Sequence, residues 1–487
     1  MKNIAFLIVL FISLSIYLLG QDKPFPQNID YPYGYQTTVI SSDHVDSLYQ
    51  RFKDTLLASC NGPGSVYRRV RCHGESDTET RSEGMGYGMI LAAYFADQGV
   101  FDSLFLFYRD KRHERALHLM SWSVTCTGEW DVGCATDGDI DVAYALLVAE
   151  DQWGGEGYLD SARAILAILK DSGFFVNDCG GGWVMQPGYS RYGGQFWGGC
   201  SLTDLSYYPP AFFRVFADAT GDGFWDYVAD DVYELYDSAA HPTTGLVPNW
   251  HSWDGVPGGT KTTEPDRDST YHYDASRIPW RLVMDYIWNG NSNAQAACEK
   301  ISDFAYGIRP SKILDGYYIN GDSLGEWNNG AFVGGFTVGG MAHSQEMLDS
   351  FATRLYWLDQ QYWDNQYYNL SLKLIYEVVM TGNFWKPEMP SGIEEPGFPQ
   401  EGLKLAQNYP NPFGGATTIE YSLSSAGFVQ LAIYDISGRE VKTLVEESVS
   451  AGEHEVSVDM GNLSPGVYIY RLEAEGNSLQ KKMVLLR

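Results

Sequence analysis

The segment Ser82–Met89, SEGMGYGM, places one carboxylate, Glu83, at the start of an apolar run that predicts a buried helix. Ser82 is positioned to cap this helix. The three glycines of this segment, Gly84, Gly86 and Gly88, are poor helix formers, so we expect them to let a bulky group approach the backbone. A helix N-terminus favours an ionised carboxylate. If Glu83 donates a proton, burial among aromatic side chains must therefore raise its pKa.

Two further segments carry carboxylates with suggestive spacing. In CATDGDIDVAYALLVAEDQW, Asp137, Asp139 and Asp141 alternate before an apolar helical pattern. A calcium loop would need Gly and Glu where Val142 and Val148 stand, so we reject calcium binding there. The run 218–226 fails the same test and predicts a turn between helices.

The segment YHYDASRIPWRL, residues 271–282, contains Asp274 and, one helical turn later, Arg277. A guanidinium at that offset can fix the position of a carboxylate. From this segment alone, a structural ion pair is the simpler interpretation.

The composition narrows the class of ligand. The chain has 62 acidic and 33 basic residues and a formal net charge of −29, which argues against nucleic acid and against an anionic membrane surface. Its 14 Trp and 34 Tyr suit a neutral polymer such as a polysaccharide, because aromatic faces stack on the apolar faces of sugars. A sugar ring would also fit against the glycines of SEGMGYGM.

Apolar periodicity predicts a mostly helical body followed by a small β-domain. The helical patterns are 43–58, 142–153, 158–169, 210–219, 224–238, 276–288, 293–308, 341–357 and 367–380. A Pro-, Gly- and Glu-rich linker spans 386–404 and separates a body at 21–385 from a β-sandwich at 405–487. The strand patterns in the sandwich are 417–423, 429–434, 453–458 and 466–472.

The N-terminus predicts export. Lys2 precedes an apolar run from Ile4 to Leu19, so residues 1–20 have the pattern of a signal peptide, and no second apolar stretch predicts a stable membrane span. Export implies an oxidising compartment. From their proximity in sequence we expect disulfides Cys60–Cys72, Cys126–Cys134 and Cys179–Cys200, with Cys298 a buried thiol. With neither a Cys-x-x-Cys pair nor a His cluster, no metal site is predicted.

Three motifs in order resemble glycoside hydrolase family 8, over roughly Tyr33 to Trp385. SEGMGYGM resembles the general-acid motif, which implies that Glu83 is the acid. The run from Ala135 to Trp153 matches the family signature with one conservative departure, at Val142, and implies that Asp137 helps to hold a distorted sugar. We expect the neighbouring Asp139 and Asp141 to be solvated or capping residues.

The remaining site residues also come from the resemblance. The Tyr-Asp-Ala-x-Arg segment implies that Asp274 is the general base, oriented by Arg277. LMSW, 119–122, implies that Trp122 stacks on a sugar, and SYYPPAFF, 206–213, implies that Tyr207 reaches the catalytic water. Tyr273 joins the expected substrate-binding residues.

The resemblance implies an all-α (α/α)6 barrel that hydrolyses internal β-1,4 bonds with inversion and needs no metal or organic cofactor. Gly86 stands where xylan-active relatives often have Ser, which favours cellulose or a related β-glucan. An Asp at position 274 disfavours chitosan, because chitosanase-type relatives take their base from elsewhere. A xylanase or licheninase on the same scaffold remains an alternative, as does a non-catalytic glycan-binding protein.

The β-sandwich resembles the C-terminal sorting domain of the type IX secretion system. The motifs are NYPNPF at 408–413, IYDISGREV at 433–441 and LSPGVYIYRL at 463–472. The implied partner is that secretion machinery, and the implied location is secreted or cell-surface attached, through the periplasm and outer membrane. A structural or carbohydrate-binding sandwich is the alternative.

Overall fold

The chain divides into two compact units, residues 1–391 and 392–487. The computed structural model describes residues 23–389 except 61–64, 73–77, 156, 191–193, 259–264 and 362–365. In the second unit it describes 404–485 except 406–407, 409–412, 414, 424–426, 436–438, 451, 461–462, 465 and 475–476. The signal-peptide prediction at 1–20 and most of the linker prediction at 386–404 lie outside these residues.

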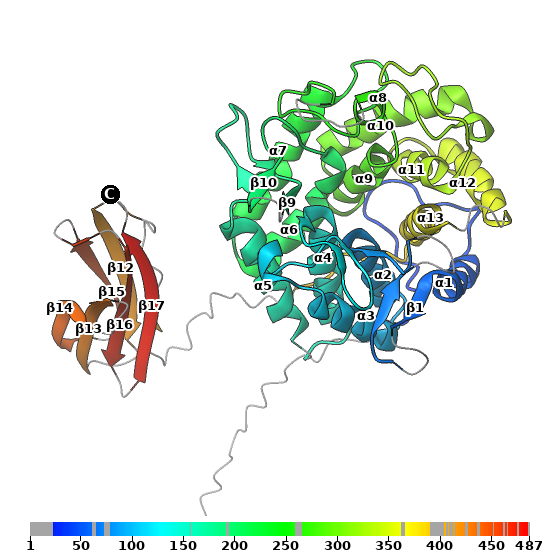
Figure 1. Cartoon of the computed structure of the whole chain (residues 1–487). Helices are drawn as coiled ribbons and strands as arrows, with labels where there is room; N and C mark the ends of the chain where they lie inside the picture. The colour runs from blue at the N-terminus through cyan, green and yellow to red at the C-terminus, as the bar shows by residue number, and fades with distance from the viewer. Residues whose placement is uncertain are drawn as a thin grey trace, which may run out of the picture. The chain divides into compact units, whose positions relative to one another are not determined.

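Six helices of the first unit form a closed inner ring, in which each helix contacts the next and the last contacts the first (Figure 1). In ring order they are α2 (Ser82–Tyr94), α4 (Thr136–Gln152), α6 (Pro210–Thr220), α9 (Ile278–Asn289), α11 (Gly330–Gly339) and α13 (Tyr367–Met380). Every residue of α2 except Glu83 is buried, and α11 is buried throughout. A helix that is apolar on all sides needs a position inside the fold, which the ring supplies.

Six amphipathic helices cover the ring from outside, each packed mainly against one inner helix. They are α1 (Ser42–Leu56), α3 (Gln98–Asp110), α5 (Tyr158–Asp171), α7 (Phe224–Ala239), α10 (Ser292–Ile308) and α12 (Gln345–Asp359). Inner and outer helices alternate along the chain, which gives the expected (α/α)6 barrel. The short helix α8 (Pro265–Asp268) lies in the connection before α9.

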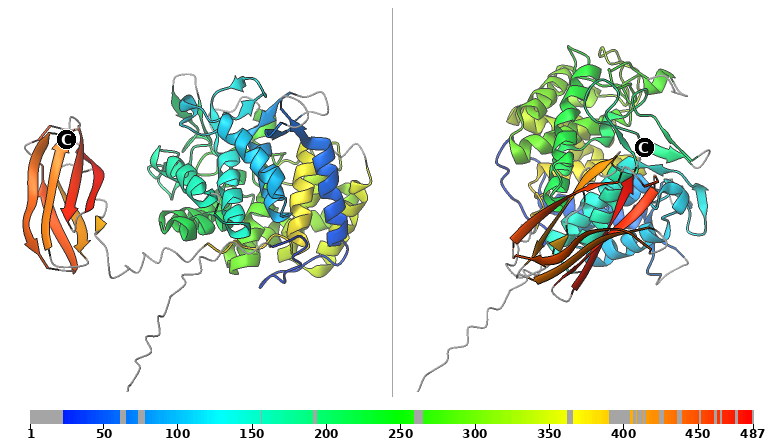
Figure 2. Two further views of the ribbon diagram at one scale, coloured as in Figure 1. Left: turned by 90° about the horizontal axis from the view of Figure 1, so that it is seen from below. Right: turned by 90° about the vertical axis from the view of Figure 1, so that its left-hand side faces the viewer.

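The alternation gives the inner helices a common direction, so their N-termini gather at one end of the barrel. Short strands lead into two of these N-termini: β3 (Thr80–Arg81) runs directly into α2, and β6 (Cys134–Ala135) runs into α4. Figure 2 shows short strands grouped at one end of the helices. The other strands of this unit are β1 (Leu57–Ser59), β2 (Arg68–Val70), β4 (Ser123–Val124), β5 (Glu129–Asp131), β7 (Phe175–Val176), β8 (Val184–Met185), β9 (Gly188–Ser190) and β10 (Gln195–Trp197).

The glycines of SEGMGYGM serve helix packing, which corrects the expectation that they admit a sugar. A Cβ at Gly86 would lie 2.6 Å from the Cβ of Asp141 on α4, and one at Gly84 would lie 2.9 Å from the Tyr367 ring. From the α4 side, a Cβ at Gly138 would lie 2.5 Å from the carbonyl carbon of Ser82. The glycines let neighbouring inner helices approach closely. Ser82 also does not cap α2: the N-cap is Arg81, and no side chain makes a capping bond.

The second unit is a β-sandwich of two antiparallel sheets. One sheet has the strand order β11-β12-β15, the other β14-β13-β16-β17, and residues from both form one apolar core. The strands are β11 (Lys404–Leu405), β12 (Ala416–Leu423), β13 (Gly427–Asp435), β14 (Glu440–Val449), β15 (Gly452–Asp459), β16 (Gly466–Ala474) and β17 (Asn477–Leu485). This confirms the predicted sandwich and adds β11, β14 and β17, which the sequence patterns did not identify.

The nine predicted helical ranges and the buried helix predicted at SEGMGYGM are all present, with shifted ends, and three helices were missed, namely α3, α8 and α11. The helix α11 has the sequence GAFVGGFTVG, which is apolar on every side and rich in Gly, so it has no amphipathic period to detect. The helix α3 begins four residues after α2 ends, so its apolar run merges with that of α2. In the described residues, no helix has the length and apolar character needed to cross a membrane.

The disulfide pattern differs from the one expected. Cys179 pairs with Cys200 as predicted, but Cys60 pairs with Cys126, 66 residues away in sequence, at a Cα–Cα distance of 5.5 Å. The predicted bridges Cys60–Cys72 and Cys126–Cys134 are therefore wrong, because the barrel brings distant loops closer than sequence neighbours. Cys298 is a buried thiol as expected, and Cys72 and Cys134 are buried thiols too.

Thiol titration of denatured, unreduced protein should therefore detect three thiols per chain, where the sequence alone predicted one. Peptide mapping should recover a cross-link between the peptides that contain Cys60 and Cys126. A count of one thiol, with a cross-link between Cys60 and Cys72, would contradict the fold described here.

Candidate active site

A fully buried guanidinium, that of Arg277, stands at the centre of an acidic cluster. Its Nη1 donates hydrogen bonds to Asp137 Oδ2 at 2.9 Å and to Glu83 Oε2 at 3.2 Å. Its Nη2 lies 3.7 Å from Asp274 Oδ1 and 3.8 Å from Asp204 Oδ2. One positive charge therefore faces four carboxyl groups.

Four carboxylates around one guanidinium would carry a large excess of negative charge, so the cluster must hold protons. Burial raises the pKa of Glu83 to about 7, and the charge of Asp137 adds to that effect, while Arg277 opposes it. Burial and the nearby Asp274 raise the pKa of Asp204 well above its ordinary value. In both groups burial therefore favours the protonated form.

Glu83 combines the properties of a proton donor. Its side chain is 18% exposed, so the carboxyl group can reach a bound ligand, yet its pKa is near neutral. Tyr367, at the start of α13, donates a hydrogen bond to Glu83 Oε1 at 2.7 Å. Burial outweighs both this hydrogen bond and the helix N-terminus, each of which favours the ionised form.

Asp274 approaches the other terminal nitrogen of the same guanidinium, and its side chain is 28% exposed. Burial raises its pKa, while Arg277 and Arg267 act to lower it. The expected pairing of Arg277 with Asp274 is present only as an ion pair between the side chains. The hydrogen bonds from Nη1 and Nη2 of Arg277 go to other residues, among them Ser206 Oγ at 2.7 Å. Arg277 Nε donates to the backbone carbonyl of Asp274 at 3.3 Å, which fixes the turn that carries the carboxylate.

The predicted aromatic residues lie around this cluster. The Trp122 carbonyl accepts a hydrogen bond from the Ser82 N–H at 3.0 Å, which puts Trp122 beside the start of α2. The guanidinium carbon of Arg277 lies 5.4 Å from the centroid of the Tyr207 ring. Tyr273 directly precedes Asp274, and its ring packs edge-on against Tyr368. The fold therefore gathers all seven predicted site residues at one end of the barrel.

Asp139 and Asp141 are fully buried, so the expectation that they are solvated or capping residues is wrong. The helix α4 begins at Thr136, earlier than predicted, and carries both acids into the interior. Asp141 forms a bidentate pair with Arg281, at 2.7 and 2.8 Å. Asp139 accepts a hydrogen bond from Tyr108 at 2.6 Å, and burial raises its pKa to about 7.

Several residues of the cluster escaped sequence analysis. Asp204 is fully buried, with Oδ1 accepting from the Ser206 N–H, and its Oδ2 has no hydrogen-bond partner among the described residues. Tyr367 and Tyr87 contact Glu83 and Arg277, respectively. Ser206 and Tyr367 lie in quoted segments, SYYPPAFF and the start of helix 367–380, but only the folded chain shows their contacts.

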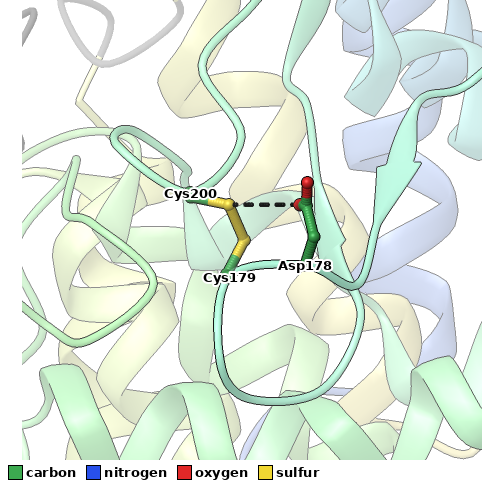
Figure 3. A group of neighbouring side chains, drawn as sticks. All are labelled: Asp178, Cys179 and Cys200. Carbon is green, nitrogen blue, oxygen red and sulfur yellow. Dashed lines mark hydrogen bonds between the residues drawn. A yellow bond between two sulfur atoms is a disulfide. The ribbon is translucent and has the colours of Figure 1, made fainter.

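Two groups of potential metal ligands lie elsewhere in the described residues. In the first, Cys179 and Cys200 are bonded to each other, so neither sulfur is a thiolate, and Asp178 Oδ1 lies 3.7 Å from Cys200 Sγ (Figure 3). In the second, Asp359 already faces the ammonium of Lys373 at 3.1 Å and His44 at 2.8 Å. We interpret the second group as a buried ion-pair network between α1, α12 and α13.

Comparison with known proteins assigns a family to each of the two units. Residues 25–382 match the model of glycosyl hydrolases family 8, and residues 407–486 match a secretion system C-terminal sorting domain. Endoglucanase A of Acetivibrio thermocellus is 31% identical, over 79% of this chain and 81% of the relative. Endoglucanase 2 of Ruminiclostridium josui is also 31% identical, over 78% and 80%. The β-1,3-1,4-glucanase structure from Paenibacillus sp. X4 aligns with a TM-score of 0.67 and 27% identity, covering 75% of this chain and 99% of that one.

The proton affinity of Glu83 can be tested through its hydrogen bond to Tyr367. Because the phenol donates to Glu83 Oε1 and favours the ionised form, Tyr367→Phe should raise the Glu83 pKa further above its wild-type value of about 7. Carboxyl-carbon NMR titration of glutamate-labelled protein measures this, and the signal lost in Glu83→Gln assigns the resonance.

Tyr368→Phe is the matched control. It removes a phenol on the same helix that donates to the Tyr273 carbonyl at 2.8 Å, and so it should leave the Glu83 titration at its wild-type position. An unchanged or lowered Glu83 pKa in Tyr367→Phe would contradict the hydrogen-bond assignment.

Proposed function

The chain belongs to glycosyl hydrolase family 8, and on that premise we propose that it is an endo-acting, inverting enzyme that cleaves β-1,4 bonds in cellulose or a related β-glucan. The observation that carries the proposal is the cluster around Arg277, in which a carboxyl with a near-neutral pKa and a second carboxylate share one guanidinium. The (α/α)6 barrel supplies the rigid end on which these groups stand.

In the proposed mechanism Glu83 is the general acid. Its pKa of about 7 keeps it largely protonated in mildly acidic solution, so it can donate a proton to the leaving glycosidic oxygen. As the proton leaves, Arg277 Nη1 at 3.2 Å stabilises the carboxylate that forms. The rate should fall as the pH rises through this pKa, because the protonated form is then lost.

Asp274 is the proposed general base, which takes a proton from the water that attacks the anomeric carbon. Because Glu83 and Asp274 contact the two terminal nitrogens of one planar guanidinium, their nearest oxygens lie at most about 9 Å apart. Inversion needs about 6.5–9.5 Å between the carboxyl groups and retention about 5 Å. The separation that inversion needs lies within this limit.

Asp137, Trp122, Tyr207 and Tyr273 are proposed to hold the sugar. Asp137 stays beside Arg277 with its other oxygen bonded to the Gly138 N–H at 2.8 Å, which leaves it rigid and suited to a hydrogen bond with a ring hydroxyl. Tyr207 is close to Arg277 and to the Asp137, Asp204 and Asp274 charges, as expected for a residue near the attacking water.

The substrate assignment rests on the endoglucanase relatives, because the sequence argument from Gly86 loses its direct basis. Gly86 faces Asp141 on α4, so its lack of a side chain serves helix packing and does not shape a sugar subsite. The alternative is a licheninase or xylanase on the same scaffold. It is supported by the similarity to the Paenibacillus glucanase structure and to an exo-oligoxylanase that is 26% identical. A purely glycan-binding role is less well supported, since Glu83, Asp137 and Asp274 are all in place.

Reducing-sugar release from carboxymethylcellulose, lichenan, xylan and chitosan tests the proposal. We expect the highest kcat/KM on carboxymethylcellulose or lichenan, with Glu83→Gln at least about 100-fold slower on each because no acid protonates the leaving group. Glu150→Gln, at a glutamate on α4 outside the site, is the control and should keep the wild-type rate. Xylan hydrolysis without glucan hydrolysis would contradict the substrate assignment.

Proton NMR of the same reaction decides the stereochemistry. Inversion of a β-linkage gives the α-anomer as the first product, before mutarotation. An initial β-anomer would show that Asp274 does not act as the proposed base.

The second unit is a type IX sorting domain, which directs the protein across the outer membrane to secretion or cell-surface attachment. Each unit has its own apolar core, so a chain that ends at Ser391 should fold and keep the wild-type kcat. In a host with the secretion system it should fail to reach the surface. Loss of turnover in a folded truncated protein, judged by circular dichroism, would contradict this division.

A further inference from the structure

Trp327 is the most exposed tryptophan of the described residues, at 64%. It lies in the loop that leads to α11, two residues before Asn329, which caps that helix by accepting from the Phe332 N–H at 3.2 Å. The N-terminus of α11 belongs to the same end of the barrel as the starts of α2 and α4. The indole therefore stands in solvent at the end that carries Glu83 and Asp274.

The buried carboxylate of Asp315 ties this loop to the active site. Asp315 Oδ1 accepts the N–H groups of Glu326 and Trp327 at 2.8 and 2.9 Å. Its Oδ2 accepts a hydrogen bond from the Tyr273 hydroxyl at 3.0 Å. A single side chain therefore joins the backbone of Trp327 to the residue that precedes Asp274.

Contacts on both sides of Trp327 make the loop rigid. The Asn329 amide donates to the Tyr273 hydroxyl at 3.1 Å. Asn328 donates to the carbonyls of Pro310 and Ile313 at 3.0 and 2.7 Å. Earlier in the same connection, Tyr317 exchanges backbone hydrogen bonds with Tyr271 at 2.9 and 3.0 Å. The loop is thus fastened to the segment Tyr271–Tyr273 at several points.

An exposed indole on a rigid support needs an explanation, because large apolar side chains held in solvent usually mark a binding surface. A ring carried on a fixed backbone loses less conformational entropy on binding than one on a mobile loop, which makes it an efficient platform for a flat apolar ligand face. The proposed substrate has such faces on every sugar unit, and it must pass Asp274.

We propose that Trp327 is the stacking platform of a distal subsite, which binds a glucose unit of the chain beyond those at the cleavage point, on the Asp274 side of the site. This inference rests on the proposed function and deepens it. Asp315 is the positioning residue of the platform, because its two oxygens fix the loop relative to Tyr273. The consequence is a preference for longer chains.

Trp327→Ala should change chain-length dependence and leave the chemistry intact. We expect kcat/KM for cellohexaose to fall about three- to tenfold, the range for one lost aromatic stack, with the effect mainly in KM. The shortest cello-oligosaccharide that the wild-type enzyme hydrolyses should react at an unchanged kcat/KM, since it does not reach the subsite. Trp327→Phe, which keeps a ring, should recover part of the loss.

Two further variants distinguish a platform from a general surface effect. Tyr227→Ala removes an aromatic residue of α7 that is 68% exposed, and it should leave both substrates at wild-type rates. Asp315→Ala should reproduce the loss on cellohexaose with Trp327 still present, because the loop is untied. Binding of cellohexaose to Glu83→Gln protein, by calorimetry, should weaken when Trp327→Ala is added.

The controls separate this inference from the proposed function. Hydrolysis of cellohexaose by the wild-type enzyme tests the proposed function alone and is measured first. If that reaction occurs and Trp327→Ala lowers kcat/KM equally for short and long chains, or for neither, the platform is overturned while the proposed function stands.

Discussion

The pairing of one buried guanidinium with four carboxyl groups is the interaction on which the site depends. Arg277 has no contact with solvent, and it meets Glu83 and Asp137 through Nη1 and approaches Asp204 and Asp274 through Nη2. Without that charge, several buried carboxyls would have to be protonated or exposed, because an uncompensated buried charge is strongly destabilising. The arginine therefore sets both the position and the protonation of the groups around it.

A second arginine extends this pattern one turn into the barrel. Asp137 and Asp141 are four residues apart on α4. Arg277 is the N-cap residue of α9, and Arg281 follows it four residues later within that helix. The pairs Asp137–Arg277 and Asp141–Arg281 therefore stack one above the other. Asp141–Arg281 is fully buried and holds the two helices in register, whereas Asp137–Arg277 lies beside Glu83, whose side chain is partly exposed.

The glycines of α2 and α4 show how the barrel accepts a locally unfavourable sequence. Each Gly inside a helix costs about 1 kcal/mol relative to Ala. Gly86 and Gly138 offset this cost by letting α2 and α4 approach until a Cβ on either would overlap the other helix. The Cys60–Cys126 bridge connects the loop after β1 to the loop after β4, close in sequence to Trp122. Packing and the covalent link thus support the same end of the molecule.

The sequence by itself was enough to predict the two units, most of the helices and seven candidate site residues, because apolar periodicity and short motifs are local properties of the chain. Their contacts were decided by the tertiary structure. Arg277 follows Asp274 by one turn, yet its hydrogen bonds from Nη1 and Nη2 go to Glu83, Asp137, Tyr87 and Ser206, all distant in sequence. The N-termini of the six inner helices converge at one end of the barrel. This convergence brings Asp204 and Tyr367 into the site, pairs Cys60 with Cys126 and buries Asp141. Sequence spacing does not encode that convergence, since it depends on the packing of whole helices.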